Sequence, residues 1–281
     1  MGVSFLITGA SGNVGQAVVN YLPLVEGDRL YRATHRKKSS DPSERWLDFE
    51  KPDSYTAALA GIDVIFLLRP PQLADVDRYF KPFIEACQQI QIKHLVFLSV
   101  QGVEMMPYIP HAKIERLIEQ SGLSYTFIRP AYFMQNLTTT LRDDITRRRR
   151  LFLPAGKSLF LWVDADDVGR AAAQVLRDWT NHKNGRYTIT GQDLVDFGTV
   201  SHWLSEQLGH LIQYESPNWL RFFWVKRRAG LSTGMILVML MLHVLPRFQK
   251  PPRISDDYQR LTGRSPQTLR RFIAEYQADW Q

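Results

Sequence analysis

The sequence predicts an α/β fold, in which a doubly wound, mostly parallel sheet of the Rossmann type is joined to a smaller helix-rich subdomain. An apolar run at residues 3–7 leads directly into a turn with Gly9, Gly12 and Gly15, and an amphipathic segment, 14–22, follows. Short apolar runs then alternate with helical spacing through the first two-thirds of the chain. This order is typical of parallel strands that are covered by helices on both faces.

The alternation predicts each element of the sheet in turn. The expected strands are 29–34, 46–48, 64–68, 95–99 and 125–129, with 186–190 added at an edge. The expected helices are 55–60, 75–89 and 113–120, where apolar residues recur at helical spacing. Beyond these the tail is helix-rich and is broken by prolines.

The glycine-rich turn has the form of a phosphate-binding loop. Gly9 allows a sharp turn off the strand, Gly12 lets backbone approach a phosphate, and Gly15 lets the helix pack closely on the strand. The helix N-terminus would direct free N–H groups at the phosphates. The spacing is G-x-x-G-x-x-G rather than G-x-G-x-x-G, but the strand–turn–helix context favours dinucleotide binding over an ordinary turn. The expected pyrophosphate-binding residues are Gly9, Ser11, Gly12, Asn13, Val14 and Gly15.

The end of the second strand indicates which dinucleotide binds. An NAD site usually places Asp or Glu there, to bond the ribose 2′-hydroxyl. This chain instead has Thr34 and His35, followed by Arg36, Lys37 and Lys38. Cations suit a 2′-phosphate, so the sequence predicts NADP(H), with Arg36 as the first contact. A solvated basic loop is the alternative.

Further cofactor contacts are expected where other strands end, because ligands of such sheets bind outside the carboxyl ends of the strands. Asp48 is expected to reach the adenine or to cap a turn, and Leu68 and Arg69 are expected to run along the cofactor. Ser99 would meet substrate or nicotinamide, or cap a loop, and Lys113 would bond the nicotinamide ribose or lie exposed. We therefore expect an NADP-binding domain at 1–150, and at 151–281 the remaining sheet edge with a helical roof over the substrate.

Composition narrows the class of protein. The 281 residues are 44% hydrophobic and 22% charged, with a single cysteine, Cys87, on an apolar helix face. A lone cysteine excludes an intrachain disulfide, and no signal peptide precedes the strand at Val3, so a cytoplasmic location is expected. The net charge is +7, but no nucleic-acid-binding module accompanies it. The run of four arginines at 147–150 is therefore expected as a solvated helix end.

Two local patterns, a group of aspartates at 164–167 and an apolar run at 231–245, each allow both a structural and a functional interpretation. Asp164, Asp166 and Asp167 have no His or Cys ligands nearby, so no metal is expected; Asp164 or Asp166 would cap a helix at 167–177. The apolar run at 231–245 is shorter than the roughly 20 residues of a membrane span. It is expected as a buried helix or a subunit contact, with no membrane partner; a membrane-associated segment is the alternative.

Several segments together resemble the NmrA-like branch of the atypical short-chain dehydrogenases. They are TGASGNVG at 8–15, FLS at 97–99, PHAKIE at 110–115, SGLSYTFIRP at 121–130, FMQNL at 133–137 and LTGRSPQTL at 261–269. The resemblance covers nearly the whole chain. It implies either an NAD(P)H-dependent reductase of quinones or isoflavones, or a cofactor-sensing regulator without chemistry.

The chain departs from most short-chain dehydrogenases at the catalytic pair. Their Tyr-x-x-x-Lys pattern would fall on Pro107 and His111 here, so the usual dyad is absent in register. His111 could instead supply a proton, or serve as a structural His at the helix start. Tyr132 and Asn136 are the other catalytic candidates, because an aromatic face suits a flat quinone and an amide can orient a carbonyl.

The sequence therefore leaves two functions open. The first is an NADPH-dependent reductase that transfers hydride to a small planar carbonyl or quinone-like substrate. The second is a non-catalytic, NADP(H)-sensing regulator of the NmrA type, with a protein partner or a homodimer contact.

Overall fold

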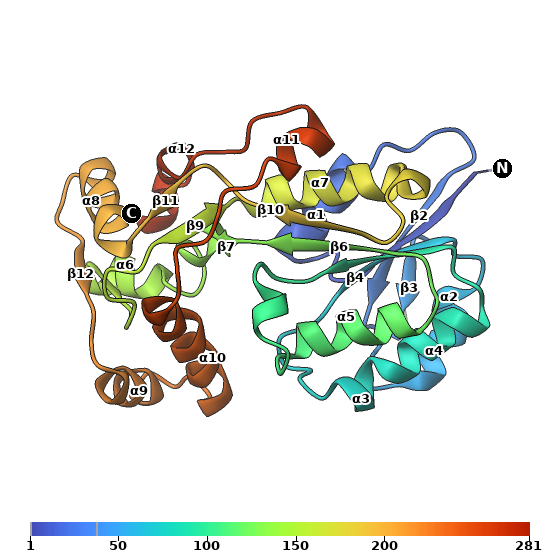
Figure 1. The fold of residues 1–281 in the computed structure, drawn as a ribbon, viewed down its shortest axis with the longest axis horizontal. Coiled ribbons are helices and arrows are strands. Elements are labelled where there is room, and N and C mark those ends of the chain that lie inside the picture. The colour runs from blue at the N-terminus through green and yellow to red at the C-terminus, as the bar shows by residue number, and fades with distance from the viewer. Residues whose placement is uncertain (1, 38) are drawn as a thin grey trace. The chain divides into compact units, whose positions relative to one another are not determined.

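The central sheet of the protein is parallel throughout (Figure 1). The structure is a computed structural model, and it describes residues 2–37 and 39–281. Within these residues seven strands form one sheet, and every neighbouring pair is parallel. In sheet order they are β10 (Gly185–Ile189), β6 (Tyr125–Pro130), β5 (His94–Leu98), β4 (Val64–Leu68), β1 (Ser4–Ile7), β2 (Arg29–Thr34) and β3 (Glu44–Trp46). The expected doubly wound sheet is confirmed, with β10 at an edge.

Helices cover both faces of this sheet, as Figure 1 shows. On one side α1 (Asn13–Tyr21) packs against α7 (Ala165–Arg177). On the other side α4 (Lys81–Gln89) packs against both α2 (Tyr55–Leu59) and α5 (Pro110–Gln120). The middle strands β4 and β5 are buried almost throughout, which explains why their sequences are continuous apolar runs.

Three expected elements have different bounds in the structure. The single helix expected at 75–89 is wrong: α3 (Val76–Tyr79) ends before α4 begins, because Pro82 has no N–H and its ring excludes the carbonyl four residues earlier. The strand expected at 46–48 ends at Trp46, because Asp48 turns away to bond the Ser54 hydroxyl. The helix expected at 167–177 begins at Ala165, so Asp166 lies in its first turn rather than at its cap.

The chain divides into two compact units. The first holds residues 1–131, 165–189 and 255–265, with α11 (Asp257–Thr262) at its end, and the second holds 132–164, 190–254 and 266–281. These units interleave along the chain, whereas the sequence analysis divides it once, at residue 150; that division into functional domains stays a prediction.

The second unit is built from short strands and helices around an aromatic core. Its buried centre includes Phe152, Trp162, Phe197 and Phe222. Its strands are β7 (Tyr132–Phe133), β8 (Arg150–Phe152), β9 (Phe160–Val163), β11 (Leu194–Val195) and β12 (Gln213–Glu215). Its helices are α6 (Arg142–Arg148), α8 (Phe197–Leu208), α9 (Trp219–Arg228), α10 (Thr233–Val244) and α12 (Leu269–Glu275).

Helix α10 carries the apolar run and is only partly buried. Ile236, Met239 and His243 face the interior, while Met235, Leu237, Val238 and Leu242 are each 45–55% exposed. Of the two expectations, a buried helix or a subunit contact, burial holds for one face only, and a subunit contact stays a prediction. A helix that is apolar on all sides has no pattern in its sequence to show which face is covered. Among residues 2–37 and 39–281, no helix combines the length and apolarity needed to cross a bilayer.

Candidate cofactor-binding site

The glycine-rich turn joins β1 to α1 at the centre of the sheet. Gly9 has φ +64°, a left-handed conformation that favours glycine, and the Gly12 N–H bonds its carbonyl at 2.9 Å. Gly12 is the N-cap of α1 and offers no side-chain acceptor. The first N–H groups of α1 are therefore left for solvent or for an anionic ligand.

The two later glycines of the turn have different roles in the folded chain. A Cβ at Gly15 would lie 2.1 Å from the carbonyl oxygen of Gly9, so only glycine fits there. A Cβ at Gly12 would meet only that same oxygen, at an ordinary 3.5 Å. The protein itself does not require glycine at Gly12, which agrees with the expectation that this position leaves room for a phosphate.

A second close approach holds α1 in place, and the sequence analysis missed it. A Cβ at Gly169 in α7 would lie 2.3 Å from the Cβ of Ala17 in α1. The small residues of the sequence Gly-Arg-Ala-Ala-Ala at 169–173 are the signal that could have found it. This packing positions the helix N-terminus at the turn.

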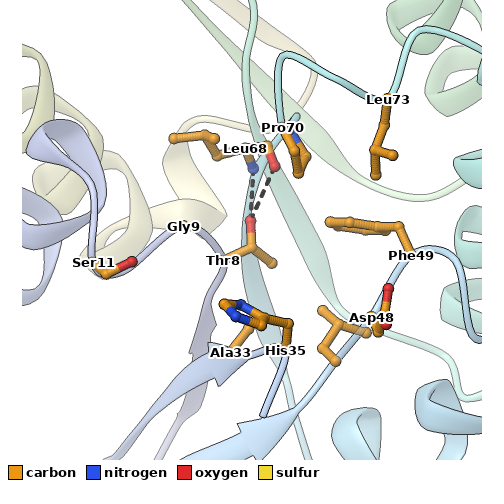
Figure 2. Close-up of a pocket in the computed structure, with 11 residues that line it drawn as sticks. Thr8, Gly9, Ser11, Ala33, His35, Asp48, Phe49, Leu68, Pro70 and Leu73 are labelled. Atoms are coloured by element: carbon orange, nitrogen blue, oxygen red, sulfur yellow. Dashed lines mark hydrogen bonds between the residues drawn. The ribbon is translucent and has the colours of Figure 1, made fainter.

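A pocket opens beside the turn at the carboxyl ends of four neighbouring strands, β1 to β4 (Figure 2). It holds about 620 Å³ of space, including its open mouth. The Thr8 hydroxyl fixes one wall, because it accepts a 2.7 Å hydrogen bond from the Leu68 N–H and lies 3.5 Å from the Leu68 carbonyl. The lining residues are Thr8, Gly9, Ser11, Ala33, His35, Leu47, Asp48, Phe49, Leu68, Pro70 and Leu73.

The basic segment after β2 lies beside this pocket. His35 lines it, whereas Arg36 is exposed and does not. The Arg36 N–H bonds the Thr34 hydroxyl at 3.2 Å, and the Lys37 ammonium lies 4.8 Å from the centre of the Trp46 ring. Lys38, the last cation of the segment, lies outside the described residues. His35 was not among the cofactor-binding residues expected from the sequence, although it belongs to the same segment.

Asp48 forms a turn, one of the two roles that the sequence left open, and its contact with an adenine stays a prediction. It lines the pocket, and its carboxylate accepts a 2.9 Å hydrogen bond from the Glu50 N–H, which closes a turn. Phe49 lines the pocket beside it, and its ring packs 5.1 Å from that of Phe80. A carboxylate and an aromatic ring at this end of the pocket form a surface on which an adenine could lie.

Arg69 shapes the loop that follows β4. Its Nη1 donates to the carbonyls of Pro70, Pro71 and Leu73, at 3.0 to 3.1 Å. Burial lowers the pKa of this guanidinium, and its buried Nε has no hydrogen-bond partner. Leu68, just before it, is in contact distance of Gly9, so the loop and the glycine-rich turn face each other.

Ser99 directly follows β5, and its side chain is also unsatisfied. The residue is 2% exposed, its N–H bonds the Ile128 carbonyl at 2.7 Å, and its Oγ has no hydrogen-bond partner. The expected loop cap therefore does not form. A buried hydroxyl without a partner among the described residues is costly. The expected contact of Ser99 with substrate or nicotinamide stays a prediction.

His111 lies in the first turn of α5, close to the end of β5. The centre of its ring lies 6.1 Å from that of Phe97. The positive charge of Arg69 disfavours protonation of this ring. Burial, with a smaller contribution from Arg69, lowers the pKa of His111 to about 3. The cause is that desolvation disfavours the imidazolium. Whether His111 supplies a proton or is a structural residue stays a prediction. At neutral pH His111 is an uncharged ring that can donate or accept one hydrogen bond.

The rest of α5 is fixed to the sheet by a buried ion pair. Arg129 of β6 donates two hydrogen bonds to the carboxylate of Glu115, from Nε to Oε1 at 3.0 Å and from Nη2 to Oε2 at 2.6 Å. Both side chains are largely buried. Lys113, two residues before Glu115, is exposed. Its proposed contact with a nicotinamide ribose stays a prediction.

Tyr132 and Asn136 belong to the second unit, whereas His111 belongs to the first. The Tyr132 hydroxyl lies 3.0 Å from Nε2 of His243, and its ring packs edge-on against Trp162 at 4.9 Å. Burial raises the pKa of Tyr132, and a hydrogen bond with Asn136 opposes this in part. The structure thus brings Tyr132 and Asn136 together, within an aromatic cluster.

The structure describes residues 2–37 and 39–281, and the expectation that no metal binds stays a prediction. No group of three or more His, Cys, Asp or Glu side chains there could hold a metal ion. Asp164, one of the acids weighed above, instead accepts a 2.6 Å hydrogen bond from Gln135.

The sequence profile of the NmrA-like family matches residues 3–220, most of the chain. The protein belongs to the NmrA-like family. Among curated relatives, Prestalk A differentiation protein A of Dictyostelium discoideum is 27% identical over 282 residues, covering 97% of this chain and 92% of the relative. The NAD(P)H azoreductase of Xenophilus azovorans is 25% identical over 286 residues, covering 97% of this chain and 98% of the relative.

Solved structures of other proteins share the fold. The NADPH-dependent quinone oxidoreductase QOR2 of Escherichia coli, in complex with NADPH, has a TM-score of 0.86 at 19% identity, covering 96% of this chain and 99% of that one. NmrA, a negative transcriptional regulator in complex with NAD, has a TM-score of 0.73 at 15% identity, covering 98% and 95%. An enzyme and a regulator thus have the same architecture as this protein.

Proposed function

We propose that this chain is an NADPH-dependent reductase that acts on a small planar carbonyl or quinone-like substrate. The observation that carries the proposal is the pocket beside the glycine-rich turn. Four parallel strands end around it, and the turn at its edge is built so that an anion can reach the N-terminus of α1.

The residues present fit a dinucleotide. The turn at Gly9–Gly15 would hold the pyrophosphate, and Asp48 and Phe49 would hold the adenine. The Oγ of Ser99 and the Nε of Arg69 are buried and unsatisfied, and a bound cofactor or substrate would give both a partner. These two atoms lie outside the turn, so they extend the proposed site beyond the phosphates.

A preference for NADP(H) over NAD(H) rests on charge. No carboxylate follows β2, where a 2′-hydroxyl would need an acceptor, and His35 and Arg36 stand there instead. Arg36 is exposed and has only its backbone N–H bonded. Its guanidinium is therefore available to a 2′-phosphate.

Bound NADPH supplies the hydride, and the protein contributes position, hydrogen bonds and exclusion of water. A neutral His111 would donate a hydrogen bond to a substrate oxygen, because its low pKa keeps it from delivering a proton as an imidazolium. Ser99 would donate a second bond from the strand end. Tyr132 and Asn136 belong to the second unit, and their proposed catalytic roles stay predictions.

Oxidation of NADPH at 340 nm, followed across small quinones and azo compounds, tests this proposal. Turnover should fall about tenfold or more in Ser99→Ala, because a hydrogen bond to the reacting oxygen is removed. His111→Ala and Asn136→Ala should also lower turnover, whereas His202→Ala, an exposed histidine on α8, should not. NADPH binding without turnover of any acceptor would contradict a reductase.

One observation favours the second candidate, a regulator that senses NADP(H). The Tyr-x-x-x-Lys register falls on Pro107 and His111, and the Pro107 carbonyl is bonded by Arg116 instead of serving a catalytic group. Two similar proteins, the Dictyostelium relative and NmrA, are named for differentiation and for transcriptional regulation. A protein partner captured only with NADP(H) present would support this candidate. Cytoplasmic location and a homodimer stay predictions.

A further inference from the structure

Helices α9 and α10 form a hairpin that exposes large apolar side chains. The two helices pack against each other and are joined by residues 229–232. Seven large apolar residues of the hairpin, together with Phe248 just beyond it, are between 45% and 81% exposed. They are Trp219, Leu220, Trp224, Met235, Leu237, Val238, Leu242 and Phe248.

These exposed residues follow helical spacing rather than being scattered. Leu220 and Trp224 are four residues apart on α9 and share one face of it. Met235, Val238 and Leu242 recur at the same kind of spacing on α10. Exposed apolar side chains that share a helix face are typical of an interaction site in a folded protein.

The hairpin is firmly attached to its own unit, so its exposed face is fixed. Phe222 of α9 is fully buried and stacks on Phe152 at 5.9 Å. Lys226, one turn later, is buried in an ion pair with Asp144. On α10 the ring of His243 is buried, and its Nε2 lies 3.0 Å from the hydroxyl of Tyr132 on β7.

The charge around the hairpin is one-sided. Residues 216–255 contain seven Lys and Arg and no Asp or Glu, whereas the whole chain has 35 and 28. The net charge of +7 therefore arises in this segment, and the rest of the chain is balanced. Arg221 pairs with Glu215 and Lys226 with Asp144; the remaining five cations have no acidic partner among the described residues. These five are Arg227, Arg228, Arg247, Lys250 and Arg253.

We propose that this hairpin binds the surface of an anionic lipid bilayer and lies in its interface without crossing it. Exposed tryptophans are favoured at the level of the lipid headgroups, and aliphatic side chains enter the acyl boundary. Unpaired cations beside them are attracted to anionic headgroups. At twelve residues, α10 is too short to span the bilayer.

Charge also favours a bilayer over a second copy of the chain. A symmetric dimer through this face would bring together two acid-free segments of seven cations each. Like charges across an interface oppose association. The phosphates of a nucleic acid would pair with the cations, but they would not bury the exposed Leu, Val and Met side chains of α10.

Co-sedimentation of the full chain with lipid vesicles tests this proposal. Binding to vesicles with 30% phosphatidylglycerol should be about tenfold or more tighter than to pure phosphatidylcholine, and should weaken as salt is raised. Trp224→Ser should weaken binding about tenfold by removing buried apolar area. Arg228→Glu should weaken it by a similar or larger factor and reduce the dependence on salt.

Matched variants off the hairpin serve as controls. Leu211→Ser removes an apolar side chain that is 74% exposed, and Arg264→Glu reverses an exposed cation of the first unit. Both should bind vesicles like the unchanged protein. Equal binding to both vesicle types, or equal losses in control and hairpin variants, would overturn the proposal. So would a dimer, measured by light scattering, that Trp224→Ser dissociates. None of these outcomes depends on the proposed reductase activity.

Discussion

Gly15 packs so closely on Gly9 that a Cβ in its place would lie 2.1 Å from the Gly9 carbonyl oxygen, whereas one at Gly12 would lie 3.5 Å from that oxygen. The two positions therefore serve different purposes, one for packing and one for a ligand. Sequence motifs treat them alike, but their substitutions separate the two roles.

Gly15→Ala should destabilise the fold, because the new methyl group must displace the backbone of the turn. Overpacking of this kind costs about 1–3 kcal/mol of unfolding free energy. Gly12→Ala should leave the unfolding free energy nearly unchanged, because its Cβ would make only an ordinary contact at 3.5 Å. It should weaken NADPH binding, because the methyl group would occupy space that we propose for a phosphate. Urea unfolding and a binding titration of both variants measure the two effects. The same loss of stability in both would contradict this division.

Arg36→Glu should weaken NADPH binding by about ten- to a hundredfold, because a charged hydrogen bond to the 2′-phosphate is replaced by repulsion. NADH binding should change little. Lys51→Glu reverses an exposed cation after β3 and is the matched control. Equal losses for both cofactors would remove Arg36 from the phosphate site.

The buried pair of Glu115 and Arg129 predicts an asymmetric response to substitution. Arg129→Met should lower the unfolding free energy by about 3–5 kcal/mol, because it leaves a buried carboxylate unpaired. The double variant Glu115→Leu with Arg129→Met should lose much less than the two single variants combined. Urea unfolding of the three variants completes the cycle. Additive losses would mean that the pair does not act as one unit.

Stability should fall as the pH drops from about 6.5 to 4. Burial lowers the pKa of both His94 and His243 to about 4, from 6.5. Below pH 6.5 the unfolded chain therefore binds protons that the folded chain excludes, so this contribution is complete above 6.5 and is lost toward pH 4. Each histidine contributes about 1.4 kcal/mol per pH unit within that window.

Urea unfolding at pH 7, 6 and 5 measures the slope. His243→Gln should reduce it by about one proton, whatever the stability of the variant at pH 7. Gln213→Ala changes an exposed side chain that does not titrate, so it is the control and should leave the slope unchanged. A slope that is flat in the unchanged protein would show that these rings titrate normally in the fold.

Much of the sheet could be predicted because it depends on local patterns. The strands β1 and β4 are apolar runs that are followed by turn residues, and they occur where the sequence pattern predicts them. The edge strand β10 was also found. The break between α3 and α4 could not be predicted, because apolar residues continue at helical spacing through Pro82 whereas the helix itself is interrupted.

The site was predicted less completely, because a sequence motif does not show which groups surround a side chain or how deeply it is buried. The glycine-rich turn was found from spacing, but the unsatisfied Ser99 hydroxyl depends on which groups surround it in space. The neutral state of His111 likewise results from burial under contacts distant in sequence. The exposed face of α10 was missed because its sequence is apolar on every side.

Isothermal titration of the full chain with NADPH, followed by NADH, tests the central claim most directly. We expect saturable binding of one NADPH per chain, weaker binding of NADH, and a rise in Tm with NADPH, since a ligand that binds only the folded state stabilises it. No heat and no change in Tm with either nucleotide would contradict the proposed site, and with it both the reductase and the cofactor-sensing regulator.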